Sequence, residues 1–245
     1  MDKKTALHYV DQWANFFLRI LGESEDLELV EMDYYTILRP RDRKWASIFD
    51  IQLEQLEGDD LLKTVSEIKE TKQHIWWNQY TNRVNSIVFP EGRHEPTSDD
   101  DEIYAVMTSD EMPTYYNETK SISIQQAATI KDFRVFHSIC FDKYLGANSL
   151  YNLYRKGLIN CYIGYKDEEP VSVVALLKNG LIHSLEFAST PHELRKQGYA
   201  TIICQKAIKD AFAEGAEVVT IRAGGGPQAD NNSKSLGVKL GFRYI

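Results

Sequence analysis

The chain has 245 residues, enough for one large domain or two small ones that each bury a core. Hydrophobic residues make up 43% of it, an ordinary share for a globular protein, and no apolar run is long enough to span a membrane. The formal net charge of −8 argues against general nucleic-acid binding. The three cysteines form no CxxC pair, which predicts neither a metal centre nor a disulfide framework. Since no apolar segment of secretory type follows Met1, we expect a cytoplasmic protein that binds neither nucleic acid nor membrane.

The first part of the chain predicts a smaller α/β domain. Apolar residues recur at helical spacing from Thr5 to Leu21, and Gly22 follows as a stop signal. The sequence then predicts strands over 27–38 and 45–53, a helix over 59–77 and short strands at 86–89 and 103–107. The polar stretch 114–120 is typical of a linker, so we expect two domains, 1–118 and 119–245.

The second part of the chain has a clearer pattern. It predicts a strand over 121–125, helices over 132–144 and 149–156, and strands over 159–165, 171–177 and 181–190. An amphipathic helix over 200–213 and a buried strand over 218–221 complete a crossover of strand, helix and strand. We therefore expect an α/β (α+β) fold in which helices flank a mixed sheet.

The chemistry concentrates in the loop that joins the strand 181–190 to the helix 200–213. Such a loop opens onto a helix N-terminus, where unpaired backbone N–H groups and the positive end of the helix dipole bind phosphate. Gly198 lacks a Cβ, so a diphosphate can approach the backbone closely there. Between Thr190 and Lys209, four cationic side chains stand against one carboxylate, which suits an anionic ligand. A plain glycine turn before a solvated helix face is the alternative.

Arg195, Gly198 and Ala200 form an Arg-x-x-Gly-x-Ala motif that resembles the acyl-CoA pyrophosphate loop of the GNAT superfamily of N-acetyltransferases. Residues 230–242 are similar to the second signature of that superfamily, an Asn-initiated helix that ends in Leu-Gly-Phe. The resemblance spans about 124–245 and implies a GNAT-like mixed sheet flanked by helices. The element order of 1–118 resembles a degenerate GNAT-like unit, although that part has no second pyrophosphate loop.

The resemblance implies acetyl-CoA as acyl-donor cosubstrate and no metal. The pantetheine would run along the strand before the loop, where a backbone N–H would stabilise the oxyanion, and the diphosphate would lie on the loop. The implied acyl-CoA contacts are Phe187, Ala188, Ser189, Arg195, Lys196, Gln197, Gly198, Tyr199, Ala200, Thr201 and Asn232.

Glu186 is the candidate general base that takes the proton of the attacking amine. It is the only carboxylate in the stretch 185–190, and alternation along the strand puts it on the same face as Ala188. Burial near the thioester would raise its pKa, as a base for an ammonium requires. A solvent-facing or ion-paired glutamate is the alternative. His183, on the opposite face, is a second candidate base, although such a histidine is more often structural.

The sequence departs from the superfamily pattern at Gly237. The resembled signature has a tyrosine at this position as general acid for the departing thiolate, and here the candidates to replace it are Ser189, Ser235, Tyr244 or water. Few residues follow Phe242, so we expect the usual closing strands to be short or absent. This leaves a sheet edge for the N-terminal half to cover.

Taken with the resemblance, these residues predict an N-acetyltransferase that moves acetyl from acetyl-CoA to a primary amine, of a small molecule sooner than of a protein. The alternative is a non-catalytic or weakly catalytic CoA-binding regulatory module, since Gly237 removes the usual acid. An interaction protein that keeps only the fold is a third hypothesis, which the intact loop disfavours. The superfamily often forms dimers, so a homodimer is considered, although nothing in the sequence specifies an interface.

Overall fold

The computed structural model describes residues 3–24, 27–40, 47–50, 52, 56–70, 74–75, 103–114, 122–141, 145–223 and 230–244. The chain forms two compact units, Ala14–Thr97 and a second one made of Met1–Trp13 with Ser98–Ile245. The first helix, α1 (Lys3–Leu21), contributes to both units, and the division falls after Trp13. None of the described helices has the length and apolar character that a membrane crossing needs.

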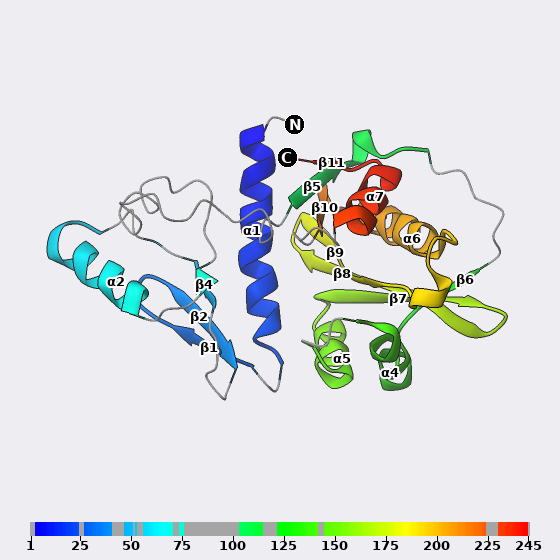
Figure 1. The fold of residues 1–245 in the computed structure, drawn as a ribbon, viewed down its shortest axis with the longest axis horizontal. Coiled ribbons are helices and arrows are strands. Elements are labelled where there is room, and N and C mark those ends of the chain that lie inside the picture. The colour runs from blue at the N-terminus through cyan, green and yellow to red at the C-terminus, as the bar shows by residue number, and fades with distance from the viewer. Residues whose placement is uncertain are drawn as a thin grey trace. The chain divides into compact units, whose positions relative to one another are not determined.

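The unit Ala14–Thr97 holds a four-stranded sheet with the strand order β1-β2-β3-β4. Besides α1, the described residues of this unit form β1 (Leu27–Glu31), β2 (Thr36–Pro40), β3 (Ser47–Phe49), α2 (Gly58–Glu70) and β4 (His74–Ile75), labelled in part in Figure 1. The single strand predicted over 27–38 is wrong, because the backbone turns between β1 and β2, where Met32 N donates to Tyr35 O at 2.9 Å. The predicted helix over 59–77 ends at Glu70, and the strand predicted over 86–89 lies outside the described residues.

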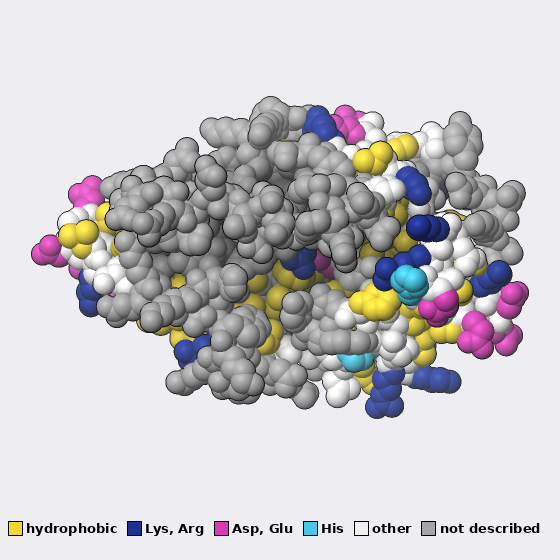
Figure 2. Space-filling view, viewed as in Figure 1, with side chains coloured by type: hydrophobic (Ala, Val, Ile, Leu, Met, Phe, Trp, Pro, Cys, Tyr) yellow, Lys and Arg dark blue, Asp and Glu magenta, His cyan; other side chains and the backbone are white. Residues whose placement is uncertain are grey.

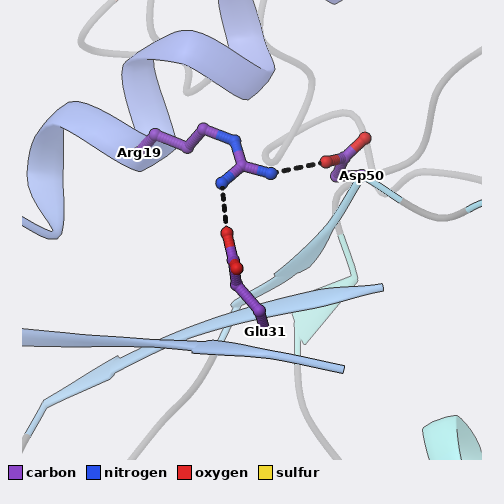
Figure 3. Close-up of polar contacts among 3 residues, drawn as sticks. All are labelled: Arg19, Glu31 and Asp50. Carbon is purple, nitrogen blue, oxygen red and sulfur yellow. Dashed lines mark hydrogen bonds and ion pairs between the residues drawn. The ribbon is translucent and has the colours of Figure 1, made fainter. Parts of the chain in front are cut away.

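Arg19, in the last turn of α1, joins two carboxylates of the same unit (Figure 3). Its Nη1 lies 3.0 Å from Glu31 Oε1 at the end of β1, and its Nη2 lies 2.6 Å from Asp50 Oδ2, directly after β3. Burial opposes the charge of Arg19, but the hydrogen bonds to Asp50 and Glu31 outweigh burial and raise its pKa. The C-terminal end of α1 is thereby tied to both strands.

The second unit is built on a seven-stranded sheet with the order β11-β5-β10-β9-β8-β7-β6. The strands are β5 (Ile103–Thr108), β6 (Ser123–Gln126), β7 (Ile159–Lys166), β8 (Glu169–Asn179), β9 (Ile182–Ser189), β10 (Val218–Ala223) and β11 (Arg243–Tyr244). All neighbours pair antiparallel except β9 and β10, which are parallel and are joined by the helix between them. The predicted mixed sheet and its crossover are confirmed.

Helices cover both faces of this sheet (Figure 1). The helices α4 (Ile130–Ile139) and α5 (Ala147–Arg155) lie on one face, and α6 (Tyr199–Ala213) and α7 (Asp230–Leu240) lie on the other. Small and aliphatic residues recur along α6 at helical spacing, so that Ile203, Ala207 and Ala211 are buried in one core cluster with Leu185 of β9. A single-turn 3-10 helix, Ser109–Glu111, follows β5, and another, His192–Leu194, lies between β9 and α6.

The strand β5 comes from the N-terminal half of the chain and lies second from one edge of the sheet. It pairs along its length with β10, and on its other side it pairs with β11, which spans only Arg243–Tyr244. This confirms that the closing strand after α7 is short and that the N-terminal half covers the edge. The first turns of α1 pack on the same strands, where Ala6 clusters with Val106 and Val218. The predicted boundary between residues 118 and 119 follows β5; it lies outside the described residues and stays a prediction.

Candidate functional site

The candidate site lies where the pairing of β9 with β10 ends. The parallel ladder runs from Ile182 and Val218 to Leu185 and Ile221, while both strands continue beyond it. After Leu185, the edge of β9 on the β10 side therefore carries backbone groups that have no ladder partner in β10. An extended ligand can pair with such an edge as an added strand would.

A β-bulge interrupts β9 in this segment. Glu186 and Ser189 pair with alternate residues of β8, so that Phe187 and Ala188 lie opposite a single residue. Phe187 has a φ of 55°, a left-handed conformation that is costly for a bulky side chain and that clusters at functional sites. The bulge makes the predicted alternation wrong at this point: Glu186 shares its face with Ser189, and Ala188 is exposed.

Glu186 is buried on β9 and forms an ion pair with a residue of β10. Its Oε2 lies 3.5 Å from Nε of Arg222, and only 3% of the Glu186 side chain is exposed. The guanidinium of Arg222 lies 5.8 Å from the ring of Trp13, on the first half of α1. Glu186 is therefore buried and not solvent-facing, and it is paired with a cation. Sequence reasoning missed Arg222, although a single charged residue at the end of the apolar run Val218–Ile221 was a signal.

Hydroxyl groups hold the end of β9 and the residue after it. Ser172 Oγ on β8 donates to Ser189 O at 3.1 Å and lies 2.9 Å from Thr190 Oγ1. Ser189 Oγ accepts a hydrogen bond from Phe141 N, in the segment after α4, at 3.1 Å. These contacts attach the bulged part of β9 to its neighbours on two sides.

Side chains of the loop between β9 and α6 fix its conformation. Arg195 donates from Nε to Thr190 O at 3.2 Å, and its guanidinium lies 5.2 Å from the centroid of the Phe141 ring. Tyr199 is buried and donates from its hydroxyl to Gln197 Oε1 at 3.0 Å. The loop is therefore held by two hydrogen bonds within it and by the ring of Phe141, which follows α4.

The start of α6 has the geometry that an anion requires. Gly198 is the N-cap residue with a φ of 85°, in the left-handed region that favours glycine. The first backbone N–H groups of a helix have no intrahelical acceptor, so those of Tyr199, Ala200 and Thr201 are directed out of the helix end. Lys196 is exposed beside them, and Figure 2 shows Lys and Arg side chains gathered in the region that Figure 1 gives to α6 and the loop before it.

His183, the second candidate base, is buried near the start of β9. Burial lowers its pKa, and the charged groups that act on it are Glu214 after α6 and Lys178 on β8. Its surroundings are thus distinct from those of Glu186, which pairs with Arg222.

The second signature forms α7, but only part of it is described at the level of side chains. Asn232 lies in the first turn of α7, and its side chain is outside the described residues. Gly237 is buried in α7, at the position where the resembled signature has tyrosine. Among the candidate acids, Ser235 is exposed and the Tyr244 side chain is not described. The contact of Asn232 with CoA stays a prediction.

The features of β9 and α6 fit the parts of an acyl-CoA in their order along the chain. The end of β9 beyond its ladder with β10 suits the amides of a pantetheine arm, and the left-handed Gly198, which has no Cβ, suits a diphosphate at the first N–H groups of α6. A thioester at the end of that arm would lie on the segment that holds Glu186 and the bulge at Phe187.

Comparison with known proteins finds similarity among solved structures. No protein-family model matches the chain, and no curated protein matches it. A GCN5-related N-acetyltransferase from Kribbella flavida superposes with a TM-score of 0.59 at 13% identity, over 95% of this chain and 91% of its own. A tandem GNAT protein from the clavulanic acid biosynthesis pathway superposes with a TM-score of 0.57 at 10% identity, over 85% of this chain and 74% of its own. At these identities the likeness establishes the fold, and it confirms the predicted GNAT-like architecture.

Proposed function

Because the chain has the fold of the GNAT acetyltransferases, we propose that it is an N-acetyltransferase that moves acetyl from acetyl-CoA to a primary amine of a small molecule. The observation that carries the proposal is the continuous path from the bulged end of β9, beyond its last ladder pair with β10, to the start of α6 at Gly198. Each part of that path offers the backbone groups that the matching part of acetyl-CoA needs.

In the proposed reaction, the amine nitrogen attacks the carbonyl carbon of the thioester. The C–N bond forms, the carbonyl oxygen gains charge that a backbone N–H of Phe187–Ser189 stabilises, and the C–S bond then breaks. Glu186 takes the proton that the amine loses, directly or through one water. CoA leaves as a thiolate and takes a proton from water, because a thiol with a reference pKa of about 8.5 departs without a strong acid.

A screen of small-molecule primary amines with the full-length chain tests this proposal. We expect acetyl-CoA to release free thiol only in the presence of particular amines, whose acetylated products mass spectrometry detects. Glu186→Gln should keep the acetyl-CoA affinity and lower kcat on the order of 10²–10⁴-fold, the usual contribution of a positioned proton acceptor. Glu193→Gln, an exposed glutamate in the same loop region, is the matched control and should behave as the wild type.

The screen, together with a measurement of acetyl-CoA binding, also decides between the transferase and the CoA-binding module. Saturable acetyl-CoA binding with no acetylated amine would favour the non-catalytic CoA-binding module. Full turnover in Glu186→Gln would contradict the role given to Glu186.

A further inference from the structure

We propose that Arg222 is a positioning residue of this reaction, which holds the Glu186 carboxylate ionised and oriented while the ring of Trp13 holds Arg222. The proposal rests on the proposed function only in making Glu186 the proton acceptor. It assigns a role to the first half of α1 in the transferase site, since Trp13 belongs to that helix and to the same compact unit as β9 and β10.

The two charged residues lie on the same face of the sheet. Val219 and Ile221 of β10 belong to the core cluster under α6, together with Leu185 of β9. Because side chains alternate along a strand, Arg222 and Glu186 lie on the opposite face. That is the face on which Val218 clusters with Ala6 of α1.

The ion pair lies at the end of the β9–β10 ladder. Arg222 follows Ile221, and Glu186 follows Leu185, which are the last two paired residues of the two strands. The pair therefore joins β9 to β10 at the point where backbone pairing stops. A change in the separation of the strands on ligand binding acts directly on the 3.5 Å contact between Arg222 Nε and Glu186 Oε2.

Burial makes the contact strong enough to matter. The side chains of Arg222 and Glu186 are 18% and 3% exposed, so water screens their attraction much less than at the surface. Burial alone disfavours a charged carboxylate, whereas a neighbouring guanidinium favours it. The Trp13 ring restricts the guanidinium by a cation–π contact, which fixes the direction of its Nε–H.

The neighbouring strand β8 supplies no charge on the face of the sheet that carries Glu186. On β8, the residues that share its face are Val173, Ala175 and Leu177, all apolar and buried. Cys140, after α4, lies with its Sγ 3.9 Å from Phe187 O. On α6 the core residues face Leu185 instead, and burial raises the pKa of the Cys204 thiol among them to about 12, so it stays neutral.

The test is a pH titration of the Glu186 carboxylate in the full-length chain by carbon-13 NMR with labelled glutamate. The loss of one signal in Glu186→Gln identifies it. In Arg222→Gln we expect this carboxylate to ionise at clearly higher pH than in the wild type, because burial is no longer opposed by a cation. In Arg222→Lys we expect Glu186 to ionise at nearly the same pH as in the wild type. In Trp13→Leu we expect it to ionise at higher pH, with a smaller change than in Arg222→Gln.

Arg243→Gln is the matched control. Arg243 lies on β11 of the same sheet and pairs with Glu111 at 3.2 Å, so its loss removes a cation without touching Glu186. An unchanged Glu186 titration in folded Arg222→Gln overturns the proposal. If Arg222→Gln does not fold, an unchanged titration in both Arg222→Lys and Trp13→Leu overturns it.

A kinetic readout separates this proposal from the proposed function. With an amine that the screen identifies, Arg222→Gln should lower kcat at least tenfold, move the acidic limb of the pH profile upward, and leave acetyl-CoA affinity within about twofold. Failure of the wild type to bind acetyl-CoA would refute the proposed function while the NMR titration still decides the role of Arg222. A kcat that is unchanged in Arg222→Gln contradicts the positioning role even if the carboxylate titration shifts.

Discussion

Arg195 shows how single residues fix the loop before α6, where the proposed site would hold the diphosphate. Its Nε is held by Thr190 O, and its guanidinium lies over the Phe141 ring. A side chain fixed in this way loses less conformational freedom when a ligand binds, so more of the interaction contributes to affinity. Phe141 is itself 57% exposed, which places the stacked pair at the surface.

Replacing Phe141 by alanine should therefore weaken acetyl-CoA binding. An exposed cation–π contact contributes about 0.5–1 kcal/mol, which corresponds to a dissociation constant about 2–5-fold higher. Phe141→Tyr keeps the ring and serves as the control. Calorimetric titration measures all three proteins, and an alanine variant that binds like the wild type would show that the ring has no such role.

The buried His183 should make stability depend on pH. Burial lowers its pKa below the ordinary value of about 6.5, so below that pH the unfolded chain binds a proton at this site that the folded chain does not. The free energy of unfolding should thus fall as the pH drops from about 7.5 to about 5.5, and less steeply in His183→Gln. Urea denaturation at both pH values measures the difference. The exposed His192→Gln is the control; an equal slope in His183→Gln and wild type would refute the prediction.

Sequence reasoning could find Glu186 but not the groups around it. A lone carboxylate in an apolar strand is visible in the sequence, whereas its pairing with Arg222 depends on the register of β9 with β10. The bulge at Phe187 was equally hidden, since strand alternation gives no signal for one extra residue. Trp13 is one of the apolar residues at helical spacing between Thr5 and Leu21, and it is buried, but its contact with Arg222 depends on how α1 packs.

Among the elements, α6 has a left-handed glycine at each end. Gly198 at its N-terminus has a φ of 85°, and Gly215 after its C-terminus has a φ of 96°. An added Cβ at Gly215 meets no atom within 4 Å, so substitution there has mainly a conformational cost. The two positions form a natural pair for separating ligand binding from helix stability.

We expect Gly198→Ala and Gly215→Ala to lower stability by a similar amount, about 1–2 kcal/mol, the cost of a left-handed conformation for a residue with a Cβ. Only Gly198→Ala should also weaken acetyl-CoA binding, on the order of tenfold, because its Cβ would lie where we propose that the diphosphate approaches the backbone. Thermal unfolding and calorimetry measure the two effects. Equal acetyl-CoA affinities in the two variants would show that the diphosphate does not bind at the start of α6.

The elements of the second unit were predictable because their patterns are local. Alternating or continuous apolar runs gave β7, β8 and β9, and helical spacing followed by a glycine gave α6. The hairpin between β1 and β2 was missed because Asp33 is a weak turn signal within a run of residues that favour strands. This turn is stabilised by the antiparallel pairing of β1 with β2, which the local sequence does not show.

At the scale of the whole chain, the N-terminal half completes the sheet that carries the candidate site. The sequence indicated that the strands after α7 are short or absent, and β5 lies beside β10 with the short β11 on its other side. The identity of that strand could not be predicted, because an antiparallel partner is chosen by long-range packing and not by local pattern. The structural likeness to the Kribbella flavida protein, which covers 95% of this chain, likewise extends beyond the residues that carry the sequence motifs.

The most direct test of the account is a titration of the nitrogen-15-labelled full-length chain with acetyl-CoA, followed by amide chemical shifts. We expect saturable shifts concentrated in the backbone amides of Phe187–Ser189 and of Gly198–Thr201, since these groups would hold the pantetheine arm and the diphosphate. The amides of α2 and of the four-stranded sheet should stay unchanged. Absence of saturable shifts, or shifts confined to the unit Ala14–Thr97, would contradict the central claim that the end of β9 and the start of α6 form an acyl-CoA site.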